Sequence, residues 1–500
     1  MGTLIAGVKL YDGTGAPGRL ADVALSGGVI SAVTPPGVCD RTRFRKVIDG
    51  AGLSLSPGWI DIHSHSDENY FETPGADSKI TQGITTEIGG NCGFSPDEKG
   101  DHGGLAAYIK RLAADPPAVN VASFTGFNSL RMQVLGDITR RATETEIARM
   151  QEIFAGELKL GSVGLSSGFY YVSGRYATMD EAARVASLLR GTGKPYAAHL
   201  RCEGAGLLDG IREVVLIASA GSGSLQISHL KTSGSGNFHL LDEAFRMIED
   251  ARRSGMRIHA DRYPYTYCST GLRMMVPEPF AGMDDDVLQE TLQNDPGKRQ
   301  MLEMLLQENP EQWDRVILVD SEFSGHASIL GKTLAEIAAG WQCDPASAAV
   351  RLLTEARPRA AFGNMSDKNL TRILQQPWVF AGSDAGCRSF GNSKVHPRAF
   401  GTMPRFFRLA RAAGVPVEEI IRRMTLAPAA KCLLHDRGAV KPGLAADLTL
   451  FDENTLDSAA DYACADRIAS GIAGVWVNGE LAWSPDQKTI AARSGKFLRC

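Results

Sequence analysis

The sequence predicts an α/β protein whose main domain is a (β/α)8 barrel of the TIM type. Short apolar runs alternate with longer segments of helical period, as expected for repeated βα units. Eight such runs fall within residues 57–435, and the gap before the eighth is far longer than one helix. A doubly wound sheet would alternate in the same way, but eight repeats favour closure into a barrel. The chain has 500 residues, more than one core usually holds, so a second module is expected.

The barrel strands are expected at the eight apolar runs, each bounded by turn residues. They are Trp59–His65, Ile84–Gly90, Asn120–Gly126, Ser162–Gly168, Pro195–Leu200, Leu225–Leu230, Arg257–Tyr265 and Trp378–Asp384. Most of the gaps hold a helical pattern, such as Thr178–Leu189 and Leu240–Ser254.

The long gap between the seventh and eighth strands predicts an insertion. Residues 277–367 contain a helical stretch at Gln300–Gln307 and a strand-like run at Val316–Val319. Loops of this length inside a compact domain are usually functional. We therefore expect a small lid or subdomain beside the mouth of the barrel.

The two ends of the chain differ from the middle and are rich in short β-like pieces with Gly-rich turns. The pieces are Thr3–Leu10, Asp22–Leu25, Val29–Val33, Gly438–Val440, Asp447–Phe451 and Gly474–Val477. We expect residues 1–56 and 436–500 to pair into one composite β-sandwich domain.

Composition excludes several classes of function. A net charge of −4 and a pI of about 6.2 leave no basic footprint for nucleic acid or anionic membranes. No apolar run approaches the roughly 18 residues that span a bilayer, and the apolar start is too short for a signal peptide. Nine scattered cysteines without a CxxC pair indicate reduced thiols. A cytoplasmic location is expected, and the sequence does not indicate an oligomeric state.

The strongest local signal is a pair of histidines, His63 and His65, at the end of the first predicted strand. Residues i and i+2 of a strand point to the same side, so both can reach one cation. An isolated pair of histidines at this spacing has a structural role at least as often as it binds a metal. The pair therefore needs further ligands before it indicates a metal.

Four such residues follow other predicted strands. His199 ends the fifth strand, His229 the sixth and Asp384 the eighth, and Cys92 follows the second. In a (β/α)8 barrel the active site is built at the carboxyl ends of the strands. The joint position of these residues predicts a metal site.

The ligand types point to zinc. Imidazole, thiolate and carboxylate together suit Zn²⁺ better than Mg²⁺ or Ca²⁺, which prefer oxygen ligands. A catalytic zinc keeps one position open and lowers the pKa of its water to about 7. Hydroxide at neutral pH can then attack an amide carbonyl that the metal also polarises.

These residues and several longer motifs resemble the amidohydrolase superfamily, and within it the N-acyl-D-amino-acid deacylases (D-aminoacylases). The resemblance extends over most of the chain. The motifs are Tyr11–Gly15, Gly164–Gly168, Ile227–Lys231, Tyr263–Tyr265, His396–Thr402 and Gly443–Leu448. The histidine pair and the late aspartate mark only the superfamily, whereas the joint occurrence of the other motifs, in order, is specific.

The resemblance implies roles for the predicted ligands. Cys92, His199 and His229 would bind one zinc tightly, and His63, His65 and Asp384 would form a second, weaker site. Asp384 would take a proton from the attacking water and pass it to the departing amine, because one carboxylate can act first as base and then as acid. Many superfamily members bridge two metals with a carbamylated lysine. Ser162–Gly168 contains no lysine, so Cys92 takes that place.

The resemblance also implies residues that hold the free carboxylate of an N-acyl amino acid: Lys231, Tyr171, Tyr263, Ser269 and Arg398. Lys231 lies two residues beyond His229 and should point into the same cavity. Arg398 can hold a carboxylate through two parallel hydrogen bonds. One departure from the family pattern is Phe127, which stands where a histidine is expected after the third strand. A core position for Phe127 is the default.

Three functions remain open on sequence alone. They are deacylation of N-acyl-D-amino acids, hydrolysis of a cyclic amide or dipeptide, and a non-catalytic scaffold. Two cations facing the metal favour an acyclic substrate with one free carboxylate. The substrate side chain is less well defined, because Arg273 would suit an acidic one and the neighbouring Met274, Met275 and Val276 an apolar one. The sequence favours the apolar side chain.

Overall fold

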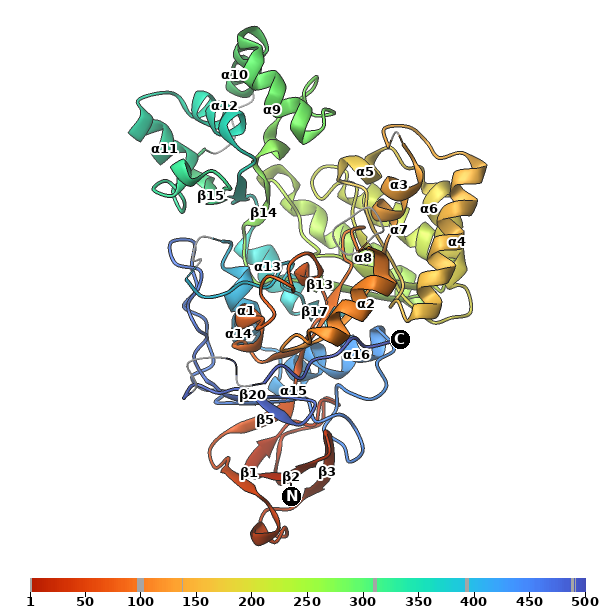
Figure 1. Cartoon of the computed structure of the whole chain (residues 1–500), viewed down its shortest axis with the longest axis vertical. Helices are drawn as coiled ribbons and strands as arrows, with labels where there is room; N and C mark the ends of the chain where they lie inside the picture. Colours follow the sequence, from red (N-terminus) through yellow and green to blue (C-terminus); the bar gives the residue numbers. More distant parts are fainter. Residues whose placement is uncertain are drawn as a thin grey trace.

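The structure is a computed structural model that describes residues 2–96, 103–136, 138–308, 313–391, 395–486, 490 and 492–500. Parallel strands and the helices around them occupy the middle of the molecule (Figure 1). A unit rich in helices projects at one end, and a sheet that includes the N-terminal strands lies at the other (Figure 1). The chain is mixed α/β.

The central strands fall into two parallel sheets. The first contains β6 (Trp59–Asp61), β7 (Ile84–Gly89) and β8 (Asn120–Ser123), and the second contains β9 (Thr125–Gly126), β10 (Leu165–Gly168), β11 (Tyr196–His199), β12 (Ser224–Ile227), β13 (Arg257–Arg262) and β17 (Val379–Ala381). Phe124 alone separates β8 from β9. A parallel bridge joins Ser64 to Ala385, just beyond β6 and β17. The two sheets thus adjoin at both of their edges, and each predicted strand overlaps an observed one.

Most of these strands end earlier than predicted, at the positions where the predicted metal ligands lie. Cys92, His229 and Asp384 have φ angles of 54°, 35° and 52°. Left-handed φ is incompatible with extended backbone and is uncommon for residues other than glycine. Strain of this kind persists mainly at functional sites, where the surrounding structure enforces it. Because the backbone turns at these three residues, their side chains lie over the carboxyl ends of the parallel strands.

Helices cover the outside of the strands (Figure 1). They are α1 (Asp77–Ile80), α2 (Gly104–Ala114), α3 (Phe127–Val134), α4 (Glu144–Leu160), α5 (Val172–Arg175), α6 (Met179–Ala186), α7 (Leu207–Ala220), α8 (Leu241–Arg253), α13 (Asp367–Leu374), α14 (Arg398–Ala412), α15 (Val417–Met424) and α16 (Leu426–Lys431). Helix α4 shows why they begin and end where they do. Thr143 and Glu146 form a capping box at its start, and Gly161 ends it with a φ of 103°.

The projecting unit follows β13 and contains an antiparallel sheet in the order β14-β16-β15. Its elements are β14 (Cys268–Gly271), α9 (Asp285–Asn294), α10 (Pro296–Glu308), β15 (Val316–Asp320), α11 (Leu334–Trp341), α12 (Pro345–Glu355) and β16 (Arg359–Phe362). The sheet begins at Cys268, before the expected boundary at residue 277. Because β14 pairs with β16, Ser269 belongs to this sheet and not to the parallel strands.

Strands from both ends of the chain form one eight-stranded sheet in the order β20-β19-β18-β5-β1-β2-β3, with β4 paired to β1. Its strands are β1 (Thr3–Leu10), β2 (Arg19–Ser26), β3 (Val29–Thr34), β4 (Lys46–Asp49), β5 (Ser54–Pro57), β18 (Leu448–Phe451), β19 (Ile472–Val477) and β20 (Glu480–Trp483). The predicted strand at Gly438–Val440 is absent, although the Val440 amide donates to the Asp12 carbonyl. The junction between the two ends is the antiparallel pairing of β5 with β18.

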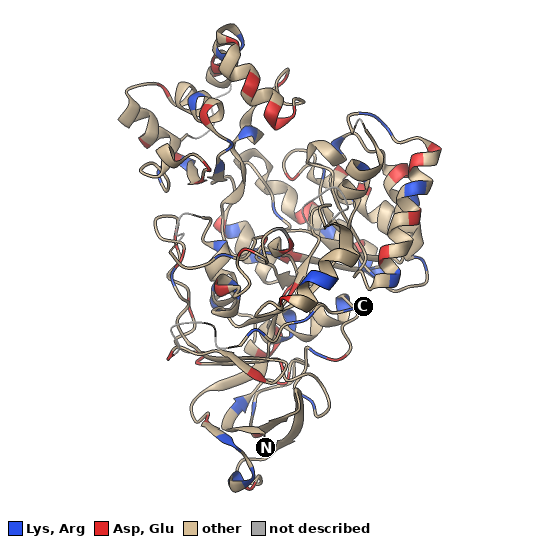
Figure 2. Cartoon of the chain, in the orientation of Figure 1, with Lys and Arg blue, Asp and Glu red and all other residues tan. Residues whose placement is uncertain are grey.

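Charged residues of both signs are interspersed over all parts of the molecule (Figure 2). Within the described residues, no helix is both long enough and apolar enough to cross a membrane.

Candidate active site

One cavity of about 520 Å³ opens beside the carboxyl ends of the parallel strands. It brings together residues from β11, from the segments that follow β7, β12 and β17, and from the inserted sheet. Ten of the eleven residues predicted from sequence line it: His65, Cys92, Tyr171, His199, His229, Lys231, Tyr263, Ser269, Asp384 and Arg398. The eleventh, His63, is fully buried beside Cys92.

Cys92, His199 and His229 converge at the base of the cavity. The Cys92 sulfur lies 3.7 Å from His199 Nδ1 and 3.7 Å from His229 Nε2. Zinc–sulfur and zinc–nitrogen bonds in a tetrahedral site put such atoms about 3.6 Å apart. The three side chains therefore have the spacing and the donor types of a zinc site.

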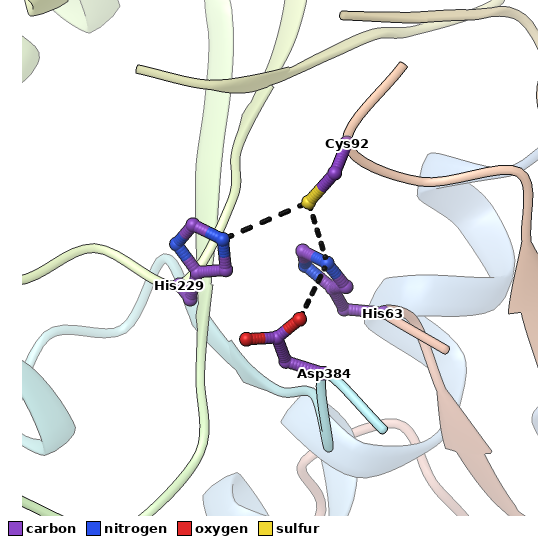
Figure 3. A group of neighbouring side chains, drawn as sticks. All are labelled: His63, Cys92, His229 and Asp384. Carbon is purple, nitrogen blue, oxygen red and sulfur yellow. Dashed lines mark hydrogen bonds and ion pairs between the residues drawn. The ribbon is translucent and has the colours of Figure 1, made fainter. Parts of the chain in front are cut away.

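A second group lies directly beside the first. An Asp384 carboxylate oxygen lies 3.4 Å from His63 Nε2 and 3.2 Å from His65 Nε2. His63 Nε2 is also 3.3 Å from the Cys92 sulfur, so one thiolate faces both groups. Figure 3 shows the Cys92 sulfur in contact with the rings of both His63 and His229, and Asp384 on the other side of the His63 ring. The arrangement suits a second metal that shares Cys92.

Electrostatics keep the candidate ligands in their anionic forms. Burial opposes a thiolate at Cys92, but the charge of His63 and hydrogen bonds from His199 and His229 hold its pKa well below the usual range. Burial likewise opposes an ionised Asp384, yet Arg398 beside it holds the pKa of that carboxyl well below its ordinary value. Metal ligands must be deprotonated, so both shifts favour metal binding.

The two cations predicted to bind the substrate carboxylate face the same cavity, and each is paired with an acid. The Arg398 guanidinium lies 2.6 Å from Asp384 Oδ2 and over the ring of Tyr263. The Lys231 ammonium contacts the carboxylate of Glu203. The Tyr263 hydroxyl is buried with no hydrogen-bond partner among the described residues. An unpaired buried hydroxyl beside two cations is suited to receive a polar ligand.

Comparison with known proteins places the chain in a family, although no family model matches it. An N-acyl-D-aspartate deacylase from Alcaligenes xylosoxydans xylosoxydans is 31% identical to it, over 99% of this chain and 94% of the relative. The chain belongs to the N-acyl-D-amino-acid deacylase family. The aligned region covers both the parallel strands and the inserted unit.

Two solved structures have the same fold as this deacylase. A D-aminoacylase with a binuclear metal centre, activated by one metal and attenuated by the second, is 30% identical with a TM-score of 0.83. That match covers 100% of this chain and 99% of the other. An N-acyl-D-glutamate deacylase from Bordetella bronchiseptica, in complex with zinc and a phosphonate inhibitor, is 29% identical with a TM-score of 0.84. That match covers all of both chains.

Sequence reasoning missed the acid that orients two of the histidines of the deacylase. Asp261 of β13 is fully buried and accepts a hydrogen bond from the His63 ring at Nδ1, 2.9 Å away. The same oxygen accepts from the backbone amide of His229 at 2.8 Å. With Nδ1 protonated, Nε2 of His63 is left free to face Cys92. An aspartate near the end of the seventh predicted strand, two residues before Tyr263, was the available signal.

A buried ionic cluster holds the backbone next to Asp384 in place. The Lys79 ammonium lies 2.9 Å from Asp61, 2.8 Å from Glu87 and 2.8 Å from the Ser383 hydroxyl. Asp61 also accepts from the backbone amide of Ser383, the residue before Asp384. Lys79 lies in a short helix beside the strands, and no sequence motif marks it.

Phe127, the departure from the family pattern, does not line the cavity of the deacylase. It is fully buried at the start of α3, and its ring centre lies 6.1 Å from that of Phe169. The side chain belongs to the apolar core that packs helices against the second parallel sheet.

Proposed function

We propose that this deacylase hydrolyses N-acyl-D-amino acids to a carboxylate and the free D-amino acid, using zinc. One observation carries the proposal. A cysteine, three histidines and an aspartate line one cavity, with His63 buried directly beside them, and the same cavity holds two cations that can receive a substrate carboxylate. A cyclic amide would have no use for this pair of cations. The family relationship favours the same reaction.

Cys92, His199 and His229 would hold one zinc tightly, and His63, His65 and Asp384 would form a weaker second site. The donor spacing of the first group, 3.7 Å on both sides of the sulfur, supports this assignment. When bound, zinc supplies a Lewis acid for the amide carbonyl and a water of lowered pKa. The D-aminoacylase with a binuclear centre supports two metal positions with different roles, since one metal activates that enzyme and the second attenuates it.

Asp384 would move the proton. Its carboxylate is held ionised by Arg398 and lies against His63 and His65, where it can accept a proton from the attacking water. The same group would then deliver that proton to the amine nitrogen as the amide bond breaks. The amine departs neutral, and the carboxylate returns to its starting state.

Lys231, Arg398, Tyr263, Ser269 and Tyr171 would bind the α-carboxylate. The guanidinium of Arg398 also reaches towards the carbonyl of Ser269, 3.5 Å away, on the inserted sheet. The Tyr171 hydroxyl lies 3.4 Å from His199 Nδ1, close to the predicted metal. These groups surround the candidate zinc ligands, as an α-carboxylate two bonds from the scissile nitrogen requires.

The substrate side chain is proposed to be apolar. A second cavity of about 310 Å³ shares Tyr170, Cys268, Thr270 and Asn364 with the main one, and Met274, Met275, Phe238 and Phe362 are among its lining residues. Arg273, the candidate for an acidic side chain, instead pairs with Asp285 and donates to the Met283 carbonyl at 2.7 Å. Its charge is directed into the inserted unit.

The proposed architecture that supports this chemistry is a closed (β/α)8 barrel at residues 57–435. A composite β-domain at 1–56 and 436–500 would complete it, with a lid unit between the last two strands. The bridge between Ser64 and Ala385 supports closure, and the pairing of β5 with β18 supports the composite domain. A cytoplasmic location remains a prediction from sequence.

Hydrolysis of a matched panel of N-acetyl D- and L-amino acids by zinc-loaded protein tests the proposal. N-acetyl-D-leucine, -methionine and -phenylalanine should be cleaved, with the L-enantiomers and N-acetyl-D-glutamate much slower. Release of free amine is measured against a metal-free sample. Turnover confined to cyclic amides, or a preference for L-substrates, would contradict the proposal.

A further inference from the structure

Glu203 lies in the loop after β11, four residues beyond His199, and its mostly buried side chain lines the cavity. A carboxylate is unexpected in a pocket that is to bind an anion, because like charges repel. We propose that Glu203 is a positioning residue that holds both His229 and Lys231. Zinc retention and recognition of the substrate carboxylate would then depend on one side chain. The inference rests on the proposed function.

The contact with His229 fixes the ring for metal binding. Nε2 of His229 faces the Cys92 sulfur, so the ring proton must reside on Nδ1 when a metal is bound. Two charged groups lie within reach of Nδ1: Glu203 Oε1 at 3.0 Å and the Lys231 ammonium at 2.8 Å. An ammonium has no lone pair and cannot accept a hydrogen bond. Glu203 is therefore the acceptor that this tautomer requires.

The second contact holds Lys231. Its side chain is 2% exposed, and its ammonium lies against both Glu203 and the His229 ring. Without the carboxylate, a buried cation would face a protonated ring nitrogen, which is unfavourable for both groups. When Nδ1 of His229 carries the ring proton and donates it to Glu203, the ring no longer accepts from Lys231, so one ammonium N–H is bound by the carboxylate and two remain for a ligand. Glu203 thus keeps Lys231 in the cavity without using all of its hydrogen-bond donors.

The other oxygen of Glu203 extends this arrangement to the third ligand. Glu203 Oε2 lies 4.0 Å from Nε2 of His199, whose Nδ1 faces Cys92. The carboxylate thus faces both histidines of the proposed tight site from the side opposite the thiolate. Only His229 is within hydrogen-bond distance of Glu203, whereas the contact with His199 is one of charge at 4.0 Å. A carboxylate that is hydrogen-bonded to a metal-binding histidine orients the ring and raises metal affinity.

The test compares Glu203→Gln with Glu213→Gln. Glu213 is a matched control because its side chain is equally exposed, at 15%, and its partner is Arg201, outside the site. Zinc affinity is measured by competition with a chromogenic chelator, without substrate. Glu203→Gln should raise the zinc dissociation constant about 10–100-fold, and the control should leave it unchanged. A change below threefold would overturn the inference.

The second arm measures selectivity at saturating zinc. The ratio of kcat/KM for N-acetyl-D-leucine to that for its amide should fall about tenfold in Glu203→Gln, since a charge-assisted contact is weakened. In a Lys231→Met background the same substitution should leave this ratio unchanged but still weaken zinc binding. A ratio that stays at the wild-type value in Glu203→Gln would overturn the coupling.

Glu203→Asp keeps the charge but withdraws it by one methylene, and it should show both effects at smaller size. If Glu203→Gln does not fold, Glu203→Asp replaces it in both measurements. Failure of the proposed function would appear differently, as absence of turnover by the wild-type protein. The zinc arm is independent of substrate and distinguishes the two outcomes.

Discussion

The two carboxylate oxygens of Asp384 make different contacts. One oxygen faces His63 and His65, and the other is bound by Arg398 at 2.6 Å. The guanidinium keeps the group ionised, so it can accept a proton, while the histidines place it beside the candidate metal. The left-handed backbone at Asp384 makes both contacts possible from one position.

Replacing Asp384 with Asn should therefore separate metal binding from turnover. The proposed tight zinc would be held by Cys92, His199 and His229, so the variant should retain about one zinc per chain. Turnover should fall by about 10²–10⁴-fold, the usual contribution of a general acid–base group. Zinc content and kcat measured on the same preparation check both parts. Retention of more than about a tenth of the wild-type kcat would mean that another group moves the proton.

Residue types at strand ends allowed the candidate ligands to be predicted, because β-strand geometry and the barrel rule place such residues together. Every predicted ligand is in or beside the cavity. Glu203, Asp261 and Lys79 could not be found in this way. Their importance arises from contacts between segments far apart in sequence, such as Asp261 with His63. A single sequence carries no record of such pairs.

At the scale of single elements, β13 carries a histidine that couples the fold to pH. The His259 ring stacks on Phe380 of β17 at 4.7 Å, and its Nδ1 has no hydrogen-bond partner in the part of the chain described. Burial and the nearby cations Lys431 and Arg252 lower the pKa of His259 to about 2. The folded state thus excludes a proton that the unfolded chain binds below pH 6.5.

It follows that stability should fall as the pH drops below 6.5, and His259→Gln should reduce that dependence. Between pH 7 and pH 5 this one group contributes a loss of up to about 2 kcal/mol in the free energy of unfolding. Chemical denaturation of wild type and variant at both pH values gives the difference directly. Parallel pH profiles for the two proteins would show that His259 does not titrate as proposed.

Element boundaries were less predictable than element order. The apolar runs marked the parallel strands, but the carboxyl ends of the sixth and eighth were predicted too far along the chain, because left-handed φ at His229 and Asp384 leaves no compositional trace. β5 was missed because Ser54–Pro57 is only four residues long and contains a single large apolar side chain, Leu55. Its partner, β18, lies near the other end of the chain. Pairing over that distance is decided by tertiary packing.

For the whole molecule, the candidate zinc ligands connect segments that are distant in sequence. Cys92 follows β7, His199 ends β11 and His229 follows β12. A metal that binds only the folded arrangement stabilises it by RT ln(1 + [L]/Kd), about 2.7 kcal/mol at 100 times Kd. Zinc should therefore stabilise the whole region of the parallel strands and not only the loops at their carboxyl ends.

Removal of zinc by a chelator should lower the temperature of thermal unfolding, and added zinc should restore it. In Cys92→Ser the difference between the two states should shrink markedly, because the shared sulfur ligand is lost. Differential scanning calorimetry with and without chelator measures both shifts. Identical unfolding temperatures with and without zinc would mean that metal binding does not stabilise the fold.

The pairing of β5 with β18 also sets the timing of assembly during translation. About 390 residues separate the two strands, and at 5–20 residues per second the ribosome needs roughly 20–80 s to deliver the second. Until then β5 has no partner on the edge that later pairs with β18, and Leu55, which is buried in the folded protein, is exposed beside it. Nascent chains in this condition are exposed to aggregation, so holdase chaperones should engage the first sixty residues throughout synthesis.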